Sequence, residues 1–464
     1  MIPSRVMSTP TGTPTPAPNP TPKTAPVTMD KLVSLCKRRG FVFPSSEIYG
    51  GFNGVWDYGP LGTELRSNLK QAWWRDFVHM REDVVGLDSG ILASPRVWEA
   101  SGHLKNFTDP MVECRSCNAR YRADQIDLSK NCANCGKKDW SEIRQFNTMF
   151  KTFVGPVEDS ASVAYLRPET CQAIFTNFKL VQGAMRKKLP FGIAQIGKAF
   201  RNEITTGNFI FRLREFEQME LEYFVRPGED ERAFETWLEH DVNWLVKYGV
   251  RREKLHLYEH PDEDRSFYSK RTVDIEYDFP FGRSELWGLA NRTDYDLTQH
   301  SKSSGEELEY FEEETKEHVV PYVIEPSLGV DRLMLTVMLE AYEEQPDKDG
   351  IRTVMHFHPR LAPVKVAVLP LVKKDGALVK KSRQIFDALR GELTVQYDET
   401  STVGRRYRRQ DEIGTPWCVT VDGQTLEDNT VTVRDRDSME QLRFPAESLL
   451  DEFQRRLREP WSRP

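Results

Sequence analysis

The chain has 464 residues, 39% of them hydrophobic, and this length and composition predict a globular protein of two or three domains. Its formal net charge of -7 excludes a broadly basic nucleic-acid coat but is compatible with a local basic patch. No apolar run approaches the roughly 20 residues of a membrane helix, and no apolar segment of a secretory signal opens the chain. Seven cysteines without an export signal favour a reducing compartment, so we expect a cytoplasmic protein with no membrane partner.

The first 28 residues are rich in proline, threonine and alanine and hold almost no bulky apolar side chains. Such a composition cannot bury enough surface to order the backbone. We therefore predict a disordered tail over 1–28.

A helix is predicted over about 60–80, because apolar side chains recur there at every fourth position and a proline suits the first turn. The stripe consists of Leu61, Leu65, Leu69, Trp73 and Phe77, after Pro60. The segment "ILASPRVW" (91–98) that follows has the composition of a strand, which Pro95 would confine to an edge.

Two CxxC pairs, separated by 14 residues, form the next feature. Four thiolates at this spacing can surround one tetrahedral Zn²⁺, and a closed site of four thiolates is structural rather than catalytic. The predicted ligands in a ribbon of about 110–140 are Cys114, Cys117, Cys132 and Cys135. Four unrelated thiols are the alternative.

Several alternating segments in the middle of the chain are separated by long connections, which favours a mixed, largely antiparallel sheet. These segments are 191–200, 209–224, 273–279 and 285–292. Between them the sequence becomes helical and charged, and we expect a helical insertion over about 227–270. From about 361 to 464, strand and helix patterns alternate again and predict a separate α/β domain.

Charged residues lie unusually close to apolar ones in the hairpin 199–220, which contains "FRNE" and the spacing R-x-x-x-F-x-x-x-E. Two further segments combine charges with apolar runs, namely "SELWGLANRTDYDL" (284–297) and "IEPSLGVDRLMLTVM" (324–338). Each arginine or glutamate taken alone would be an ordinary surface charge. The ordered set is specific.

This set resembles the class II aminoacyl-tRNA synthetases, with "FRNE" and the downstream R-x-x-x-F as motif 2 and "GVDR" as motif 3. The helix at 60–80 with Pro95 after it resembles motif 1. More closely, "RPETCQ", "FRNEI", "REFEQMELEYF", "ELWGLANRTDYDL" and "EPSLGVDR", in that order, resemble the dimeric, single-chain glycyl-tRNA synthetases. The resemblance extends from about residue 29 to the end of the chain.

The resemblance implies an α+β fold, with a class II catalytic domain over 29–360 and an anticodon-binding α/β domain over 361–464. It also implies activation of glycine with ATP and Mg²⁺, transfer to tRNA(Gly), and a homodimer. Since the carboxylate of glycine is already a nucleophile, catalysis reduces to positioning and charge neutralisation. The catalytic residues implied are Arg201, Glu285 and Arg332.

A guanidinium binds oxyanions with two parallel hydrogen bonds, which suits Arg201 to the α-phosphate and the substrate carboxylate. By resemblance, Phe216 stacks on adenine, Arg332 covers its other face, and Glu285 holds Mg²⁺. The ATP-binding residues implied are Arg201, Asn202, Glu203, Phe211, Arg212, Phe216, Glu285, Leu286, Gly329 and Arg332.

Glycine has no side chain, so its pocket must hold the ammonium group and leave no room for a Cβ. Converging carboxylates bind an ammonium group, and in the empty pocket they raise one another's pKa. The glycine-binding residues implied are Arg96, Glu169, Phe216, Glu220, Arg292, Glu325 and Ser327. Cys171 departs from the family's alanine in "RPETAQ", and an exposed thiol there would be sensitive to oxidation.

The stretch "GRRYRRQDEIGTPW" (404–417) is a candidate tRNA surface, because arginines interleaved with aromatic side chains hold single-stranded RNA. Its arginines are Arg405, Arg406, Arg408 and Arg409. A solvated charged helix face is the alternative for each of them.

Two other functions compete with glycine–tRNA ligation. A synthetase for another small amino acid would share the fold, but the three glutamates and the "ANRTDYDL" segment oppose it. A non-catalytic relative that serves a polymerase as a nucleic-acid-binding subunit could lose its ATP arginines, whereas this chain keeps them.

Overall fold

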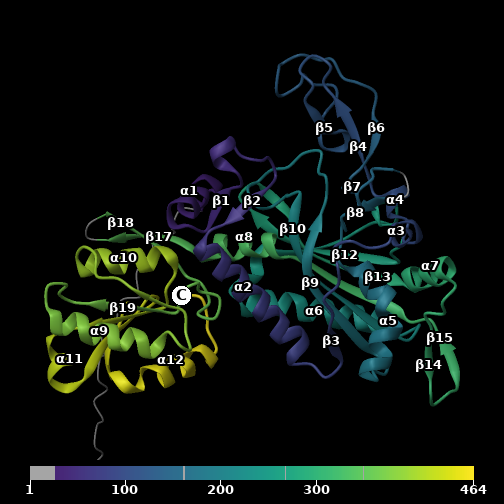
Figure 1. Cartoon of the computed structure of the whole chain (residues 1–464). Helices are drawn as coiled ribbons and strands as arrows, with labels where there is room; N and C mark the ends of the chain where they lie inside the picture. The colour runs from purple at the N-terminus through teal and green to yellow at the C-terminus, as the bar shows by residue number, and fades with distance from the viewer. Residues whose placement is uncertain (1–26, 160–161, 267, 348–349) are drawn as a thin grey trace, which may run out of the picture.

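The computed structural model describes residues 27–159, 162–266, 268–347 and 350–464 (Figure 1). Residues 1–26, which make up most of the predicted disordered tail, lie outside the described residues. At the centre is a seven-stranded sheet in the order β11-β12-β13-β16-β10-β9-β3. Its strands are β3 (Val84–Gly86), β9 (Phe191–Phe200), β10 (Glu215–Val225), β11 (Leu255–Glu259), β12 (Arg271–Phe279), β13 (Gly282–Thr293) and β16 (Tyr322–Gly329). All its neighbours pair antiparallel except β3 and β9, which confirms the predicted mixed, mostly antiparallel sheet.

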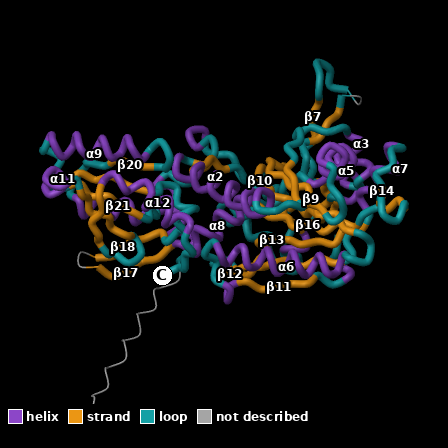
Figure 2. The backbone as a smooth tube through the Cα atoms, turned by 90° about the horizontal axis from the view of Figure 1, so that it is seen from below, coloured by secondary structure: helices purple, strands orange, loops and turns teal. Residues whose placement is uncertain are grey.

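Helices cover both faces of this sheet (Figure 2). One face carries α2 (Pro60–Trp74), α6 (Asp230–Lys247) and α8 (Val330–Ala341), and the other carries α5 (Cys171–Met185) and α7 (Tyr295–Ser304). Strand β10 buries apolar side chains on both faces, which accounts for the helices on each side. Met219 and Leu221 enter the large core under α8, and Phe224 enters a second core under α5. The helical segment expected as an insertion therefore belongs partly to the sheet, because α6 packs on it and β11 is its edge strand.

The predicted helix at 60–80 is confirmed, with α2 continuing into a π-helical turn over Arg75–His79. The strand expected at 91–98 is wrong, because Pro95 opens α3 (Pro95–Ala100), which buries Trp98. Proline has no N–H to donate and a fixed φ, so it fits the first turn of a helix as well as a strand edge. Short neighbouring elements are α1 (Met29–Arg39), β1 (Val42–Pro44), β2 (Trp56–Tyr58), α4 (His103–Asn106), β7 (Lys151–Phe153), β8 (Val163–Tyr165), β14 (Tyr310–Glu312) and β15 (Glu317–Val319).

A small three-stranded sheet projects from the central sheet at the top of Figure 1. Its strands are β4 (Thr108–Glu113), β5 (Arg120–Arg122) and β6 (Arg144–Asn147), and its turns carry the four paired cysteines. This unit is the ribbon that the cysteine spacing predicts.

The C-terminal part forms a second α/β unit with a five-stranded sheet in the order β20-β19-β21-β22-β23. Its elements are β19 (Val366–Pro370), α9 (Gly376–Leu389), β20 (Val395–Tyr397), α10 (Val403–Ile413), β21 (Trp417–Val421), α11 (Gly423–Asp428), β22 (Thr430–Asp435), β23 (Gln441–Pro445) and α12 (Leu449–Arg458). The hairpin of β17 (Tyr342–Asp347) and β18 (Gly350–Met355) joins it to α8. Within the described ranges, no helix has the length and apolar character needed to cross a membrane.

Candidate active site

A cavity lies where the loop between β9 and β10 meets β13 and the start of α8. Alternating strand positions and the first turn of α8 direct side chains from four segments into it. Its lining residues are Arg201, Glu203, Ile210, Phe211, Arg212, Leu213, Phe216, Gln218, Glu285, Leu286, Ser327, Gly329, Asp331 and Arg332. Every residue implied to bind ATP lines this cavity except Asn202. The structure places Asn202 in an adjacent hollow beside the ribbon, with its N–H donating to the carbonyl of Thr148.

An ion pair closes one side of the cavity. Arg332 Nη1 lies 2.9 Å from Glu285 Oε2 and donates to the carbonyl of Glu285 at 3.2 Å. The guanidinium carbon also lies 4.5 Å from the ring centre of Phe211, so Arg332 stacks on an aromatic platform. The positive charge of Arg332 lowers the pKa of Glu285, which keeps that carboxylate ionised beside the cavity.

Arg201 reaches the cavity from the opposite side, one residue beyond the end of β9. Its Nε donates to the carbonyl of Pro168 at 3.0 Å, and its guanidinium carbon lies 5.4 Å from the ring centre of Phe216. The Nε contact fixes the direction of the planar group, and Arg201 lines the cavity. Arg212 and Glu203 complete this wall as a pair 3.6 Å apart. The cavity thus presents three guanidinium groups, which suits a polyanion.

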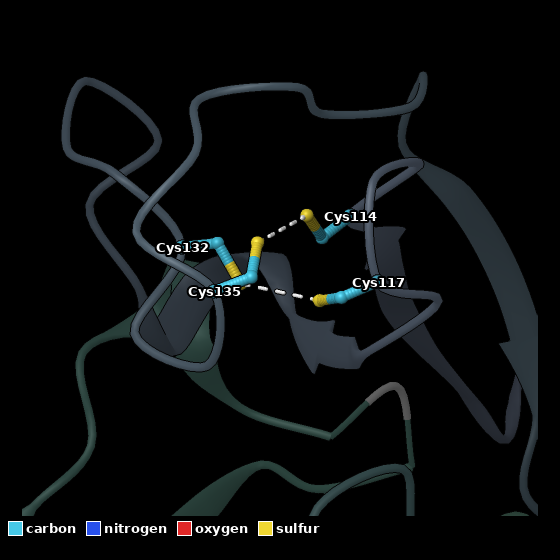
Figure 3. A group of neighbouring side chains, drawn as sticks. All are labelled: Cys114, Cys117, Cys132 and Cys135. Carbon is cyan, nitrogen blue, oxygen red and sulfur yellow. Dashed lines mark hydrogen bonds between the residues drawn. The ribbon is translucent and has the colours of Figure 1, made fainter.

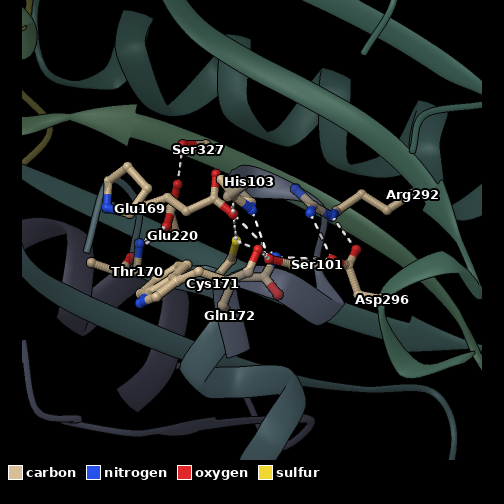
Figure 4. Close-up of polar contacts among 12 residues, drawn as sticks. Ser101, His103, Glu169, Thr170, Cys171, Gln172, Glu220, Arg292, Asp296 and Ser327 are labelled. Carbon is tan, nitrogen blue, oxygen red and sulfur yellow. Dashed lines mark hydrogen bonds and ion pairs between the residues drawn. The ribbon is translucent and has the colours of Figure 1, made fainter. Parts of the chain in front are cut away.

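Below the cavity lies a buried acidic cluster on the α5 face of the sheet (Figure 4). Glu220 accepts hydrogen bonds from Ser327 Oγ at 2.8 Å, Gln218 Nε2 at 2.9 Å and the N–H of Thr170 at 2.8 Å. Ser327 and Gln218 also line the cavity. The cavity and the acidic cluster are therefore continuous, and Ser327 stands between them.

Glu169 enters the cluster from the segment before α5. His103 Nε2 lies 3.0 Å from Glu169 Oε1, and the thiol of Cys171 and the amide of Gln172 donate to the same oxygen at 2.9 and 3.1 Å. Burial is the largest single influence on Glu169 and opposes its charge, but His103, Arg292 and the Cys171 thiol together outweigh it and lower the pKa of this carboxyl well below its usual range. Sequence reasoning missed His103 and Gln172. Gln172 could have been found inside the "RPETCQ" motif, whereas nothing local marks His103.

Glu325 forms the third member of the cluster. Arg292 Nη1 donates to both of its oxygens at 3.1 and 3.0 Å, and Arg292 Nε donates to Asp296 Oδ2 at 2.7 Å. Burial is the main influence on Glu325 and, despite Arg292, raises its pKa to about 8. Repulsion from Glu220 and Glu169 adds to the effect of burial on Glu325, as expected of converging carboxylates, whereas the pKa of Glu169 is lowered, chiefly by the histidine at hydrogen-bond distance.

Arg96 differs from its expected surroundings, whereas Cys171 does not meet the condition of exposure on which its sensitivity to oxidation depends. The structure does not bring Arg96 to the cluster, since its exposed side chain donates to the carbonyl of Ser303 and lines a separate hollow with His300. Cys171 lies in the cluster but is fully buried, and burial raises its pKa well above the usual range of a thiol. The expected sensitivity to oxidation does not apply to a thiol so enclosed.

The four ribbon cysteines converge on one point (Figure 3). Cys114 Sγ lies 3.6 Å from Cys135 Sγ, and Cys117 Sγ lies 3.8 Å from Cys132 Sγ. Thiolates bound to a tetrahedral Zn²⁺ at about 2.3 Å stand roughly 3.8 Å from one another. The arrangement therefore fits one tetrahedral metal ion.

Helix α10 presents its arginines unequally. Arg406 is buried and donates to the carbonyls of Ser401, Glu399 and Thr400, so the structure does not support its predicted contact with tRNA. Arg408 pairs with Asp347, and Arg409 pairs with Asp398. Arg405 is exposed and remains a candidate for RNA.

Comparison with known proteins agrees with this geometry. Residues 156–342 match the family described as "tRNA synthetase class II core domain (G, H, P, S and T)", and residues 365–456 match "Anticodon binding domain". A glycine–tRNA ligase of Geobacillus thermodenitrificans is 54% identical over 90% of this chain and 95% of its own. One from Streptomyces coelicolor is 55% identical over 91% and 96%, and one from Clostridium perfringens is 52% identical over 91% and 97%.

Proposed function

This chain belongs to the class II aminoacyl-tRNA synthetases and, within them, to the glycine–tRNA ligases, and we propose that the two adjoining sites divide the substrates, with ATP in the cavity and glycine in the acidic cluster. The enzyme activates glycine with ATP to glycyl-adenylate and pyrophosphate, and then transfers glycine to the 3′ end of tRNA(Gly). The observation that carries the assignment of the sites is their continuity through Ser327, which lines the cavity and donates to Glu220. Two substrates that must react with each other need such adjacent sites.

In the activation step, a carboxylate oxygen of glycine attacks the α-phosphorus of ATP, and pyrophosphate leaves with the electrons of the broken P–O bond. No proton moves, so the chain supplies position and positive charge rather than a general base. Arg201 neutralises the α-phosphate and orients the glycine carboxylate, Phe216 stacks on adenine, and Arg332 faces it from the far side. Arg212 binds the terminal phosphates. The three guanidinium groups on the cavity wall support these roles.

The acidic cluster binds the glycine ammonium group. Glu169, Glu220 and Glu325 are each at least nine-tenths buried, so negative charge there is poorly screened and attracts a cation strongly, and a bound cation favours the ionised form of Glu325. Arg292 offsets part of this negative charge, and its hydrogen bonds hold Glu325 in one orientation. Larger amino acids are expected to be rejected by clash, because α5 packs on the strand face that carries Glu220.

The cavity residues fit Mg²⁺ and the ribbon residues fit Zn²⁺. Glu285 is an ionised carboxylate in a cavity lined by cationic groups, and it would hold Mg²⁺, which neutralises phosphate charge when bound. The sulfur–sulfur distances of the ribbon support one structural Zn²⁺ held by the four thiolates. Bound there, Zn²⁺ would contribute folding energy to the ribbon, and a site closed by four thiolates would leave no open position for chemistry.

The enzyme acts as a homodimer in the cytoplasm. Motif 1 of its family, with α2 as the matching helix, supports the dimer, and the seven free cysteines support a reducing compartment. Exposed Ile48, Tyr49 and Phe52 lie close to α2 in the sequence and offer an apolar surface for the partner subunit. Light scattering during gel filtration at micromolar concentration tests this, and a monomer mass contradicts it.

Amino-acid-dependent ATP–pyrophosphate exchange without tRNA, run with all twenty amino acids, tests the assignment of the two sites. Exchange with glycine in the wild-type enzyme and its loss in Glu220→Gln support the acidic cluster as the glycine site. Exchange that survives this substitution with an unchanged KM for glycine contradicts it.

A further inference from the structure

Glu222 is a buried carboxyl group that the proposed mechanism does not use. Because β10 and β16 pair antiparallel with Glu220 opposite Ser327, Glu222 falls opposite Glu325 and on the same face of the sheet. Its side chain is fully buried, and neither of its oxygens has a hydrogen-bond partner among the described residues. A buried carboxylate without a partner is very costly, so the group requires either a bound cation or a proton.

A cation is the weaker explanation. The thiol sulfur of Cys171 and one oxygen each of Glu222 and Glu325 lie within 4.8 Å of one another, a spacing that a metal ion could use. However, Arg292 already donates to both oxygens of Glu325, and its positive charge repels a second cation at that point. The thiol is also protonated, because burial raises its pKa, and it donates to Glu169. A proton on Glu222 therefore accounts for the arrangement better than a metal.

The charges around Glu222 favour the protonated form. Groups that face it come from its own strand, from β16, β13, α5 and α7, and they are Glu220, Glu325, Arg292, Cys171 and Asp296. Glu169 and Tyr268 act on Glu325 one step further away. Burial first, and then the charge of Glu325, raise the pKa of Glu222 well above that of an ordinary glutamate, and Arg292 does not offset this.

We infer that Glu222 is a positioning residue of the glycine site. When the ammonium group of glycine holds Glu325 as a carboxylate, Glu222 stays protonated and donates its O–H to Glu325, one oxygen of which lies within 4.8 Å. That hydrogen bond holds Glu325 between Arg292 and the ammonium group of the substrate. Glu222 thus contributes a hydrogen-bond donor and no charge. The pocket keeps the carboxylates that bind one ammonium group, and Glu222 does not add a buried carboxylate without a partner. This inference rests on the proposed assignment of glycine to the acidic cluster.

Two uncharged substitutions test whether Glu222 acts as a hydrogen-bond donor. Both variants are measured by glycine-dependent pyrophosphate exchange. Glu222→Gln keeps the shape and supplies an amide donor, so the KM for glycine should stay within about twofold of wild type. Glu222→Leu removes the donor at similar volume, and the KM for glycine should rise on the order of tenfold or more, with the KM for ATP unchanged. In wild-type enzyme, loss of the shared proton at alkaline pH should raise the KM for glycine further than it rises in Glu222→Gln, which has no such proton.

The outcomes separate this inference from the site on which it rests. A Glu222→Gln enzyme as impaired as Glu222→Leu, or a Glu222→Leu enzyme with the wild-type KM, overturns the role of Glu222. An unchanged KM in Glu220→Gln overturns the glycine site, and the inference with it. Thermal unfolding of each variant controls for misfolding. Should Glu222→Leu fail to fold, identical pH profiles of wild type and Glu222→Gln overturn the inference.

Discussion

Replacing Arg201 with alanine should nearly abolish adenylate formation and leave the fold intact. The structural cost is small, because the side chain is half-buried and loses one hydrogen bond from Nε to the carbonyl of Pro168, together with its position over the ring of Phe216. We expect a loss of about 1 kcal/mol in the free energy of unfolding. The catalytic cost is larger, because each lost donor to a developing charge slows a reaction by roughly 10²–10³-fold, and Arg201 serves two oxyanions.

The rate of glycine-dependent pyrophosphate exchange should therefore fall by at least about 10³-fold, which corresponds to roughly 4 kcal/mol of transition-state stabilisation. Arg201→Lys keeps the charge but not the planar fork, so its exchange rate should fall between those of the wild type and Arg201→Ala. Lys198→Ala, an exposed position on β9 three residues before Arg201, is the matched control and should exchange normally. Binding of tRNA(Gly), measured by filter retention, should be nearly unchanged in all three. Near-normal exchange by Arg201→Ala would refute the role assigned to this residue.

Three further predictions concern the ribbon, the buried ion pairs and pH. Cys117→Ser should lower the zinc content, measured by elemental mass spectrometry, below one ion per chain. Cys418→Ala, outside the ribbon, should leave the zinc content unchanged. Equal zinc content in the two variants contradicts the site. Arg292→Ala leaves Glu325 and Asp296 buried without their partner and should lower the free energy of unfolding in urea by about 3–5 kcal/mol. The exposed Arg405→Ala should lower it by less than about 0.5 kcal/mol. Equal losses would show that the buried ion pairs contribute nothing to stability. Glu325 holds a proton in the folded, glycine-free enzyme up to a pKa of about 8, from a usual value of 4.5, so its contribution to the free energy of unfolding is complete below pH 4.5 and is lost as the pH rises toward 8. Glu325→Gln should flatten this decline, and an unchanged slope would mean that another group causes it.

Local patterns predicted the parts of the fold whose cause is local. The fourfold apolar repeat and Pro60 predicted α2, and the alternating segments predicted β9, β12 and β13. The segment at 91–98 was mispredicted because a proline among apolar residues fits both a strand edge and a first helical turn. Only the packing of Trp98 in the fold selects the helix.

The candidate site shows the same division. Resemblance of motifs selected ten of the fourteen residues that line the cavity, because these residues lie within three short, recognisable segments. It did not find His103, which is 66 residues before Glu169 in the chain and reaches it only through the fold. Nor did it distinguish Arg405 from Arg406, since neighbouring arginines on a helix look alike until one of them is buried against loop carbonyls.

The sequence by itself determined the chemical inventory of this enzyme, namely the paired thiols proposed to bind zinc, the arginines proposed to bind ATP and the glutamates proposed to bind an ammonium group. Residue type and short spacing suffice for this, because they decide which groups can act and on which face of a strand or helix they lie. Only the tertiary structure decided the charge state and availability of each group. Glu169, Glu222 and Glu325 are chemically identical, yet a histidine lowers the pKa of the first, and burial beside another carboxyl raises those of the other two. Such differences arise from partners brought together across the chain, and no local pattern carries them.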